Sequence, residues 1–282
     1  MKVRTWLILA AVLILVGAIM FGGVMMACNW NFLKLQNLEF ETSTYSVQEP
    51  FSHISISVDT TDVTVCLTEE NTASVVCFEQ KKIKHTVEVK DDTLTVREVD
   101  TRAWYEHIGI AFHSSKVTVY LPRAVYGAVT IEGSTSDLQI DSLCAKSLNL
   151  SLSTGDITVN DIKTSGGITS AVSTGDINLT DIQCHTFTAS ASTGDIHLKN
   201  TVADQEFSVQ TKTGGIFLEG CDAARLTIKA STGDIVGWLL SPKTFIAQTD
   251  TGSVHVPMST NGGLCEIHTQ TGDIDIDAIT AP

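Results

Sequence analysis

Apolar and polar residues alternate along most of the chain after residue 50, and the alternation is organised around a recurring Thr-Gly pair. The pair occurs seven times, and successive copies lie 20, 19, 20, 19, 19 and 20 residues apart. Its glycines are Gly155, Gly175, Gly194, Gly214, Gly233, Gly252 and Gly272. Two positions after them come Ile157, Ile177, Ile196, Ile216, Ile235, Val254 and Ile274. Period-two alternation on both sides of a glycine predicts two β-strands that meet at a corner, each with one buried face.

A single unit of this kind cannot bury its apolar face, whereas stacked units form a continuous core. In a parallel stack matching positions lie ~4.8 Å apart, so each apolar column packs like residues on like residues. The corner glycine supplies a positive φ at low steric cost. We therefore predict an all-β protein, a single-stranded, β-helix-like β-solenoid whose 19–20-residue coils stack in chain order. A meander of antiparallel hairpins is the alternative, because Ser-Thr-Gly-Asp also suits a hairpin loop.

The N-terminus carries an uncharged run from Thr5 to Ala27, preceded by Lys2 and Arg4. At ~1.5 Å per helical residue this run is long enough to span the ~30 Å hydrocarbon core of a bilayer. It predicts a transmembrane signal anchor over residues 1–28, with the C-terminal domain outside the cytoplasm because the basic end stays inside. Cleavage as a signal peptide, or lipidation at Cys28, is the alternative.

The remaining chain divides by the strength of its periodicity. Residues 29–50 lack a pattern and are expected to form a linker. Residues 51–125 contain irregular strand-like stretches, which we expect to cap the stack, since an open end exposes unpaired strand edges. Residues 126–282 form the regular repeats.

Acidic residues outnumber basic ones by 32 to 18, a net charge of −14, which argues against nucleic acid as a partner. Five acids follow corner glycines, namely Asp156, Asp176, Asp195, Asp234 and Asp273. A ladder of carboxylates could coordinate Ca²⁺. The simpler interpretation is that each accepts a hydrogen bond from backbone N–H groups at the corner. Because Gly215 and Ser253 interrupt the ladder, we expect a structural role with no metal or cofactor.

Six cysteines lie beyond the membrane segment, namely Cys66, Cys77, Cys144, Cys184, Cys221 and Cys265. Three of them, Cys144, Cys184 and Cys221, fall at similar places in alternate units, about 9.6 Å apart along a stack. That distance exceeds the ~7 Å that a disulfide allows between Cα atoms, so we expect buried thiols that act as small apolar residues. The pair Cys66 and Cys77 remains open as a disulfide.

Two adjacent aromatic residues, Trp104 and Tyr105, interrupt the strand pattern. They could form a platform for a ligand or partner, or cover the N-terminal end of the core. The sequence has no Gly-x-Ser-x-Gly elbow, and its eight histidines are scattered, so we expect no catalytic residues.

The strand that ends in Val119-Tyr120-Leu121-Pro122 is followed by Ser-Thr-Gly-Asp-Ile units at 153–157, 173–177, 192–196 and 231–235. In these features the chain resembles the bacterial DUF4097 family, whose members are described as adhesins. The resemblance covers roughly residues 50–280. It implies a β-solenoid on a bacterial envelope behind one membrane-spanning helix, and it brings no catalytic residues with it.

Together these observations predict a non-enzymatic, membrane-anchored cell-surface protein, an adhesin or an envelope interaction scaffold. It would act by multivalent contact along a repetitive surface, with an envelope protein or a glycan as partner. A carbohydrate-active enzyme on a β-helix scaffold and an envelope-stress sensing component are the alternatives.

Overall fold

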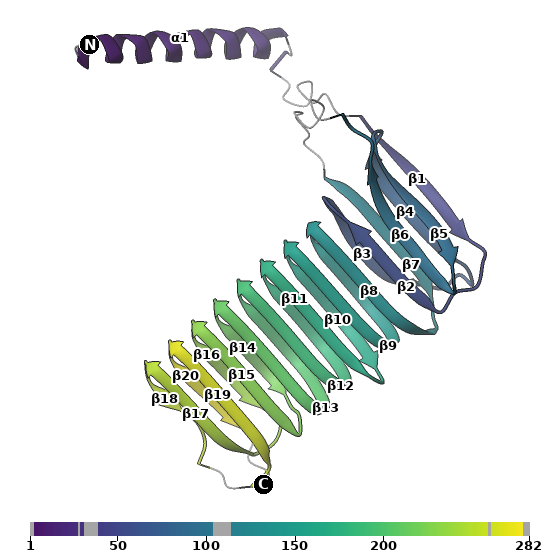
Figure 1. The fold of residues 1–282 in the computed structure, drawn as a ribbon, viewed down its shortest axis with the longest axis vertical. Coiled ribbons are helices and arrows are strands. Elements are labelled where there is room, and N and C mark those ends of the chain that lie inside the picture. The colour runs from purple at the N-terminus through teal and green to yellow at the C-terminus, as the bar shows by residue number, and fades with distance from the viewer. Residues whose placement is uncertain (1–2, 28, 31–38, 104–113, 259–260, 279–282) are drawn as a thin grey trace.

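The computed structural model describes residues 3–27, 29–30, 39–103, 114–258 and 261–278, and shows one helix and an elongated stack of strands (Figure 1). The N-terminal elements are α1 (Val3–Ala27), β1 (Phe40–Val47), β2 (His53–Val58), β3 (Thr61–Thr68), β4 (Ala73–Gln80), β5 (Ile83–Lys90), β6 (Thr93–Asp100) and β7 (Ser115–Pro122). The middle of the stack contains β8 (Val125–Thr135), β9 (Leu138–Thr154), β10 (Ile157–Thr164), β11 (Gly167–Thr174), β12 (Ile177–Thr193) and β13 (Ile196–Thr213). The C-terminal strands are β14 (Ile216–Cys221), β15 (Arg225–Thr232), β16 (Ile235–Leu239), β17 (Lys243–Thr251), β18 (Val254–His255), β19 (Gly263–Thr271) and β20 (Ile274–Ala278).

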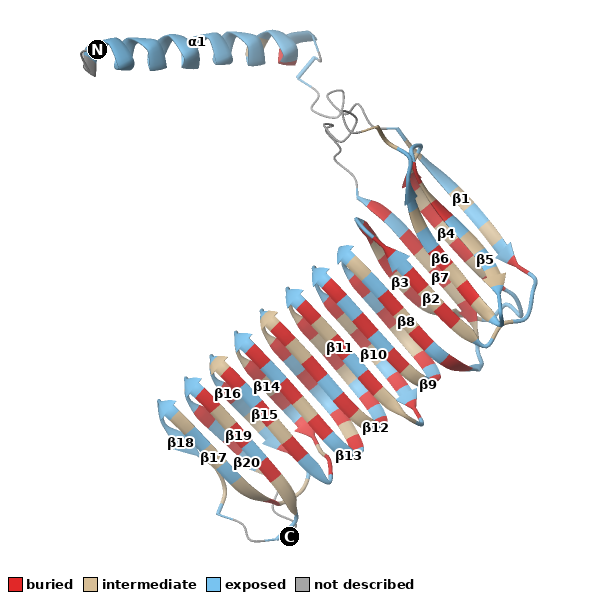
Figure 2. Cartoon of the chain, viewed as in Figure 1, coloured by how far each residue is buried: buried red, intermediate tan, exposed pale blue. Residues whose placement is uncertain are grey.

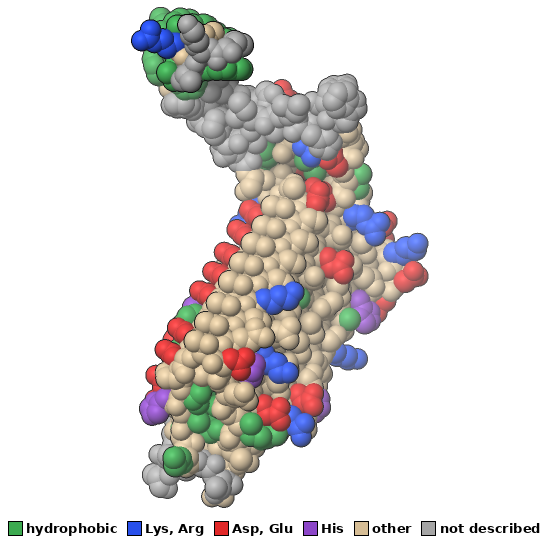
Figure 3. Space-filling model, turned by 60° about the vertical axis from the view of Figure 1, so that its left-hand side comes forward, with side chains coloured by type: hydrophobic (Ala, Val, Ile, Leu, Met, Phe, Trp, Pro, Cys, Tyr) green, Lys and Arg blue, Asp and Glu red, His purple; other side chains and the backbone are tan. Residues whose placement is uncertain are grey.

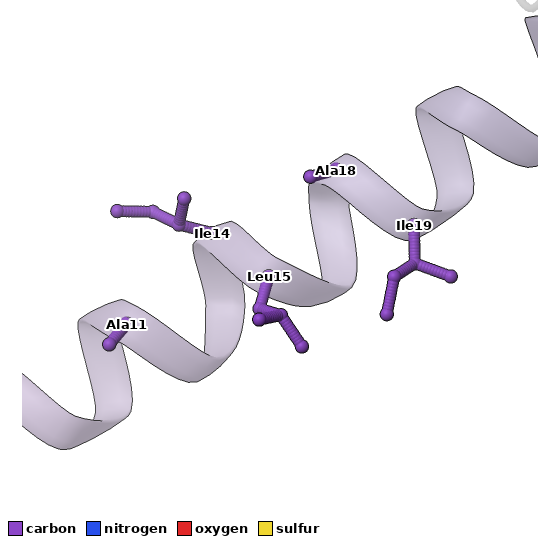
Figure 4. A pocket seen from close by; sticks show the side chains of 5 residues that line it. All are labelled: Ala11, Ile14, Leu15, Ala18 and Ile19. Carbon is purple, nitrogen blue, oxygen red and sulfur yellow. The ribbon is translucent and has the colours of Figure 1, made fainter.

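Helix α1 is long and apolar enough to cross a membrane, with a mean hydropathy of 2.8 over its most apolar window. Apart from that of Met25, its large side chains are exposed, and Figure 4 shows Ala11, Ile14, Leu15, Ala18 and Ile19 projecting from it without a polar atom. A helix that is apolar on all sides and covered by no other part of the described protein suits a lipid environment. Its length, composition and position near the N-terminus suit a membrane anchor or a signal sequence.

The regular part of the stack has two layers of parallel strands that meet at the corners. In one layer β9, β10, β12, β13, β14 and β16 are successive neighbours. The other layer contains β8, β9, β11, β12, β13 and β15, because the long strands β9, β12 and β13 turn a corner and contribute to both. The parallel β-solenoid predicted from the repeat is thus confirmed, and the meander alternative is wrong for this region.

The predicted isoleucine column forms the centre of the core. Ile157 pairs with Ile177, and the column continues through Ile196, Ile216 and Ile235, all of them completely buried. Figure 2 shows the resulting alternation of buried and exposed positions along every coil. Burying one such side chain contributes roughly 1.5–3 kcal/mol, so each coil adds several kcal/mol that it cannot gain alone.

The order of the last two coils corrects the expectation that coils stack in chain order. The final coil, β19 with β20, lies between the coil of β15 and β16 and the coil of β17 and β18. Of these last two coils, the final coil has the more apolar inward face. Its inward residues are at most 2% exposed, namely Cys265, Ile267, Ile274 and Ile276. The unit with the better apolar columns therefore takes the interior place.

The N-terminal end shows the same departure from chain order. The coil of β2 and β3 lies between the coil of β8 and β9 and the strands β6 and β7. Beyond them, β5 pairs antiparallel with β6, and β4 pairs antiparallel with β7 and β1. The expected linker over residues 29–50 therefore needs correction, because β1 is a full edge strand. Its polar composition hides the period-two pattern, while the Phe40 ring stacks on Phe78 at 5.1 Å.

Candidate interaction surface

The Thr-Gly corners lie one above another along one edge of the stack. All seven corner glycines have a positive φ, from +121° at Gly155 to +148° at Gly272. A Cβ atom added at Gly194 would lie 1.9 Å from the carbonyl oxygen of Gly175 in the coil below. Each corner therefore requires its glycine for two reasons, namely the backbone conformation and the close approach of successive coils.

The corner aspartates connect each coil to its neighbour. The Asp156 carboxylate accepts a hydrogen bond from the Asp176 N–H at 2.8 Å, and Asp176 accepts one from Asp195 at 2.7 Å. Asp195 in turn accepts the Gly215 N–H at 2.7 Å, and the same contact joins Asp234 to Asp273. Acidic side chains line one edge of the stack in Figure 3. The geometry gives these carboxylates a bonding role between coils, whereas the alternative of Ca²⁺ binding is untested.

We expect Asp195→Ala to lower the free energy of unfolding by about 1 kcal/mol, because it removes an acceptor for a backbone N–H between coils. Urea unfolding followed by circular dichroism measures the change. The matched control is Asp204→Ala, since this exposed carboxylate makes only a 3.8 Å approach to His185. Equal effects of the two substitutions would contradict the role of the corner carboxylate.

A second set of corner residues escaped the sequence analysis. Ser142, Asp161, Asp181 and Asn200 have φ values between +49° and +58°. Asn and Asp tolerate this left-handed conformation, and the Asn200 amide also donates to the Asp181 carboxylate at 2.8 Å. The available signal was the column of Asp161, Asp181, Asn200 and Gly220 six positions after successive corner glycines.

The outward side of one layer carries three rings and one aliphatic side chain that together we call the aromatic patch, made of His197, Phe217, Val236 and Trp238. The first three occupy one outward column on β13, β14 and β16, and the rings of His197 and Phe217 stack at 4.5 Å. Trp238 is 38% exposed and Val236 36% exposed. Exposed rings in a rigid sheet are typical of contacts with partners that bury apolar surface.

Two glycines make room for these rings. A Cβ atom at Gly215 would lie 2.7 Å from the Phe217 ring, and one at Gly220 would lie 3.0 Å from the Trp238 ring. Gly215 occupies the position at which other coils carry a corner aspartate, and Gly220 the position of Asp181 and Asn200. The repeat therefore loses two polar side chains where it gains two aromatic ones on its outward side, the half-buried Phe217 and the exposed Trp238.

The aromatic residues singled out from sequence, Trp104 and Tyr105, lie outside the described residues. The six cysteines are free. Cys66 and Cys77 cannot meet, because Cys77 points into the core while Cys66 lies half-buried on a strand separated from β4 by β7. The prediction that Cys144 and Cys184 occupy the same column, both buried, is wrong for Cys144. Cys144 lies in the column of Lys163 and Gln183, one position before Cys184, and is therefore exposed.

A buried polar cluster lies between the layers at the N-terminal end, where ligand atoms of Cys77, Glu79 and His85 all lie within 4.8 Å of one another. The cluster is bonded within the protein. Both the backbone N–H and Nδ1 of His85 lie 2.8 Å from Oε2 of Glu79, while Ser43 and Lys84 donate to its Oε1. The Cys77 thiol has its pKa raised to about 12 by burial and remains protonated. The arrangement thus functions as an ion-paired part of the core.

The Glu79 carboxylate should make stability depend on acid. Burial raises its pKa, but the hydrogen bonds from His85 and Ser43 and the Lys84 charge outweigh burial and hold the pKa below 4.5. A depressed pKa contributes stability that is present above the unfolded value and is lost as pH falls through the folded one. We expect the free energy of unfolding to fall more steeply from about pH 5 to about pH 3 in the wild type than in Glu79→Gln. The exposed Glu132→Gln is the control, and parallel curves for Glu79→Gln and wild type would contradict this.

Comparison with solved structures shows the same fold elsewhere. A protein from Bacteroides fragilis described as a "putative adhesin" has a TM-score of 0.50 and 12% identity, over 86% of this chain and 97% of that chain. A "putative lipid binding protein" from Parabacteroides distasonis has a TM-score of 0.49 and 14% identity, over 87% of this chain and 98% of that one. At 12% identity, the likeness to the Bacteroides fragilis protein establishes the fold alone.

Curated proteins offer no match to this chain. A family model, Toastrack DUF4097, matches residues 51–167 and 163–281. The two matches cover more than half of the chain, including all the regular coils and most of the irregular N-terminal strands. They meet between β10 and β11, so the family pattern runs through the stack without a break. The protein therefore belongs to the Toastrack DUF4097 family.

Proposed function

We propose that this protein is a non-enzymatic, membrane-anchored surface protein that makes adhesin-like contacts with an envelope partner through the aromatic patch. The observation that carries the proposal is the exchange of polar repeat residues for the half-buried ring of Phe217 and the exposed ring of Trp238, each beside a glycine that makes room for it. These rings sit on a stack whose opposite end is joined in sequence to α1. The name given to the structural neighbour from Bacteroides fragilis supports the same class of function.

The charge of the stack suits a role at a distance from the membrane. Without Lys2 and Arg4 the chain holds 32 acidic and 16 basic residues. A strongly anionic ectodomain is repelled by anionic lipid and stands away from the bilayer. Many copies on one surface would then present the aromatic patch together, so that weak single contacts add to a stable attachment.

The corner carboxylates are poorly suited to glycoside hydrolysis, the main enzymatic alternative. That reaction needs a carboxylic acid whose pKa is raised so that it can protonate the leaving oxygen. Hydrogen bonds from the backbone N–H and the hydroxyl of Ser253 instead lower the pKa of Asp273. The carboxylates of Asp156, Asp176 and Asp195 are likewise engaged by backbone N–H groups. This geometry favours binding without turnover.

In the test, vesicles that carry the full chain are mixed with isolated bacterial envelopes, which serve as the probe. We expect Trp238→Ala to weaken envelope binding about tenfold, roughly 1.4 kcal/mol, because truncating a central exposed ring removes its buried contact area. The control is Val125→Ala, which truncates a side chain that is 73% exposed on β8. Protease and periodate treatment of the envelopes then distinguishes a protein partner from a glycan. Equal binding by both variants, or release of glycan fragments, would overturn the proposal.

A further inference from the structure

We infer that the C-terminal end of the stack pairs with the same end of a second copy of this chain, strand edge to strand edge. The inference deepens the proposed adhesin-like function and rests on it for its biological setting. Among the described residues, β17 pairs only with β19, and β18 pairs only with β20. Both layers of the stack therefore end in a strand whose outer edge has backbone groups without a strand partner.

The side chains of this last coil continue the columns of the core but are only partly covered. Val254 belongs to the isoleucine column and is 44% exposed, whereas its neighbour Ile274 is buried. Phe245 and Ala247 pack against the core and are only half-buried. On the outward side, Ile246 is 58% exposed. One further strand added to each layer would bury the apolar side chains that remain exposed at this end.

The opposite end of the stack is protected against such pairing. Its outer strands are β1 and β5, and ion pairs join Lys81 to Glu39 and Lys84 to Glu41 there. Charged side chains on an edge strand discourage pairing with another chain. The central part of β17 has less of this protection, because residues 244–249 contain no charged side chain, Lys243 is buried, and the exposed Asp250 lies near the end of the strand. The two ends of the stack thus differ in how strongly charged side chains protect their edge strands from pairing with another chain.

A second copy fits this end because any partner must offer two strand edges, one for each layer. A copy of the chain presents both edges at the required separation. A two-fold axis perpendicular to the layers and through the middle of β17 places β17 antiparallel to the partner's β17. Since β1, the first strand after α1 in the sequence, lies at the other end, the two anchors of such a pair are attached at opposite ends of the joined stacks. The contact would join two membranes.

Each contact is expected to be weak. A few residues of strand edge bury less than the ~800 Å² per partner of a standard interface. The excess of 32 acidic over 16 basic residues outside the membrane segment also makes two stacks repel each other until salt screens them. Weak contacts of this kind become effective when many copies act in parallel between two surfaces.

The experiment uses the full chain in two populations of phosphatidylcholine vesicles, labelled as energy-transfer donor and acceptor. We expect vesicle clustering that grows as salt rises from about 50 mM to about 500 mM. Ile246→Lys combined with Val254→Lys should lower clustering at least tenfold, because the substitution at 246 brings like charges together across the two-fold axis and the substitution at 254 places a charge at the open end of the isoleucine column. The matched control is Val125→Lys combined with Thr169→Lys, which introduces the same two charges at exposed positions of β8 and β11, strands whose two edges are already paired.

The outcomes separate this inference from the proposed function. If only the aromatic patch is functional, Trp238→Ala loses envelope binding while wild-type vesicles remain dispersed, which overturns the end-to-end contact. Clustering by the double variant at the wild-type level also overturns it, as do head-to-tail filaments in electron micrographs. Hydrogen exchange needs no variant, since clustering should slow the exchange of amides 244–249 in the wild type. Unchanged exchange at these amides in clustered vesicles would count against the pairing.

Discussion

Gly194→Ala is expected to lower the free energy of unfolding by more than about 4 kcal/mol, or to prevent the stack from forming. Gly194 has a φ of +136°, in a region that residues with a Cβ atom do not adopt without strain. The added methyl would also lie 1.9 Å from the Gly175 carbonyl oxygen. That oxygen belongs to the corner of the next coil, so the clash cannot be relieved by moving a side chain.

Chemical unfolding followed by far-UV circular dichroism provides the measurement for Gly194→Ala. The matched control is Gly167→Ala, because Gly167 has no positive φ and its added methyl would come close only to the Thr186 hydroxyl, at 2.8 Å, while the Thr186 carbonyl oxygen lies at an ordinary contact distance of 3.8 Å. A hydroxyl can rotate away, so the control should cost less than half as much. A similar loss for both variants would show that the corner geometry does not require glycine.

Lys243→Met is expected to lower the free energy of unfolding by about 3 kcal/mol, because it removes one partner of a buried ion pair. Lys243 is 3% exposed, and its ammonium lies 2.5 Å from the Asp222 carboxylate. It also donates to the Ala223 carbonyl at 2.7 Å and to the Ser241 hydroxyl at 2.9 Å. Methionine fills the same space but leaves the Asp222 carboxylate without its cation.

A double-mutant cycle tests this explanation. Lys243→Met combined with Asp222→Asn should recover part of the loss, because no uncompensated charge then remains. The two substitutions should therefore be non-additive. A loss for the double variant equal to the sum of the two single losses would contradict the ion-pair explanation and point to packing alone.

The Lys243 contact also explains how the last coils are held out of chain order. Lys243 pairs with Gly263 of the inserted coil, yet its ammonium bonds to residues 222 and 223, which lie one coil further in. A Cβ atom at Gly263 would approach the carbonyl oxygens of Ala223 and Ala224. The glycine thus keeps a side chain out of the region that Lys243 crosses. From sequence alone, Lys243 and Gly263 had no assigned role.

The repeat was sufficient to predict the regular coils, because identical residues at fixed spacing determine which side chain faces the core and which residues share a column. The same pattern carries no information about which coil lies beside which at the ends, since every unit offers a similar surface. The order of β17 to β20 depends instead on single contacts such as that of Lys243. The aromatic patch was missed for a related reason, because Phe217 and Trp238 occupy outward positions that the apolar columns do not include.

The inserted final coil changes how this end of the stack comes apart. In a solenoid that follows chain order, the outermost coil is also the last in sequence and can detach alone. Here the coil of β19 and β20 is enclosed on both sides, so it cannot leave before the coil of β17 and β18 has opened. The smallest opening that frees the last coil therefore includes two coils. Amides in β19 and β20 should exchange no faster than those in β17, although they come later in the chain.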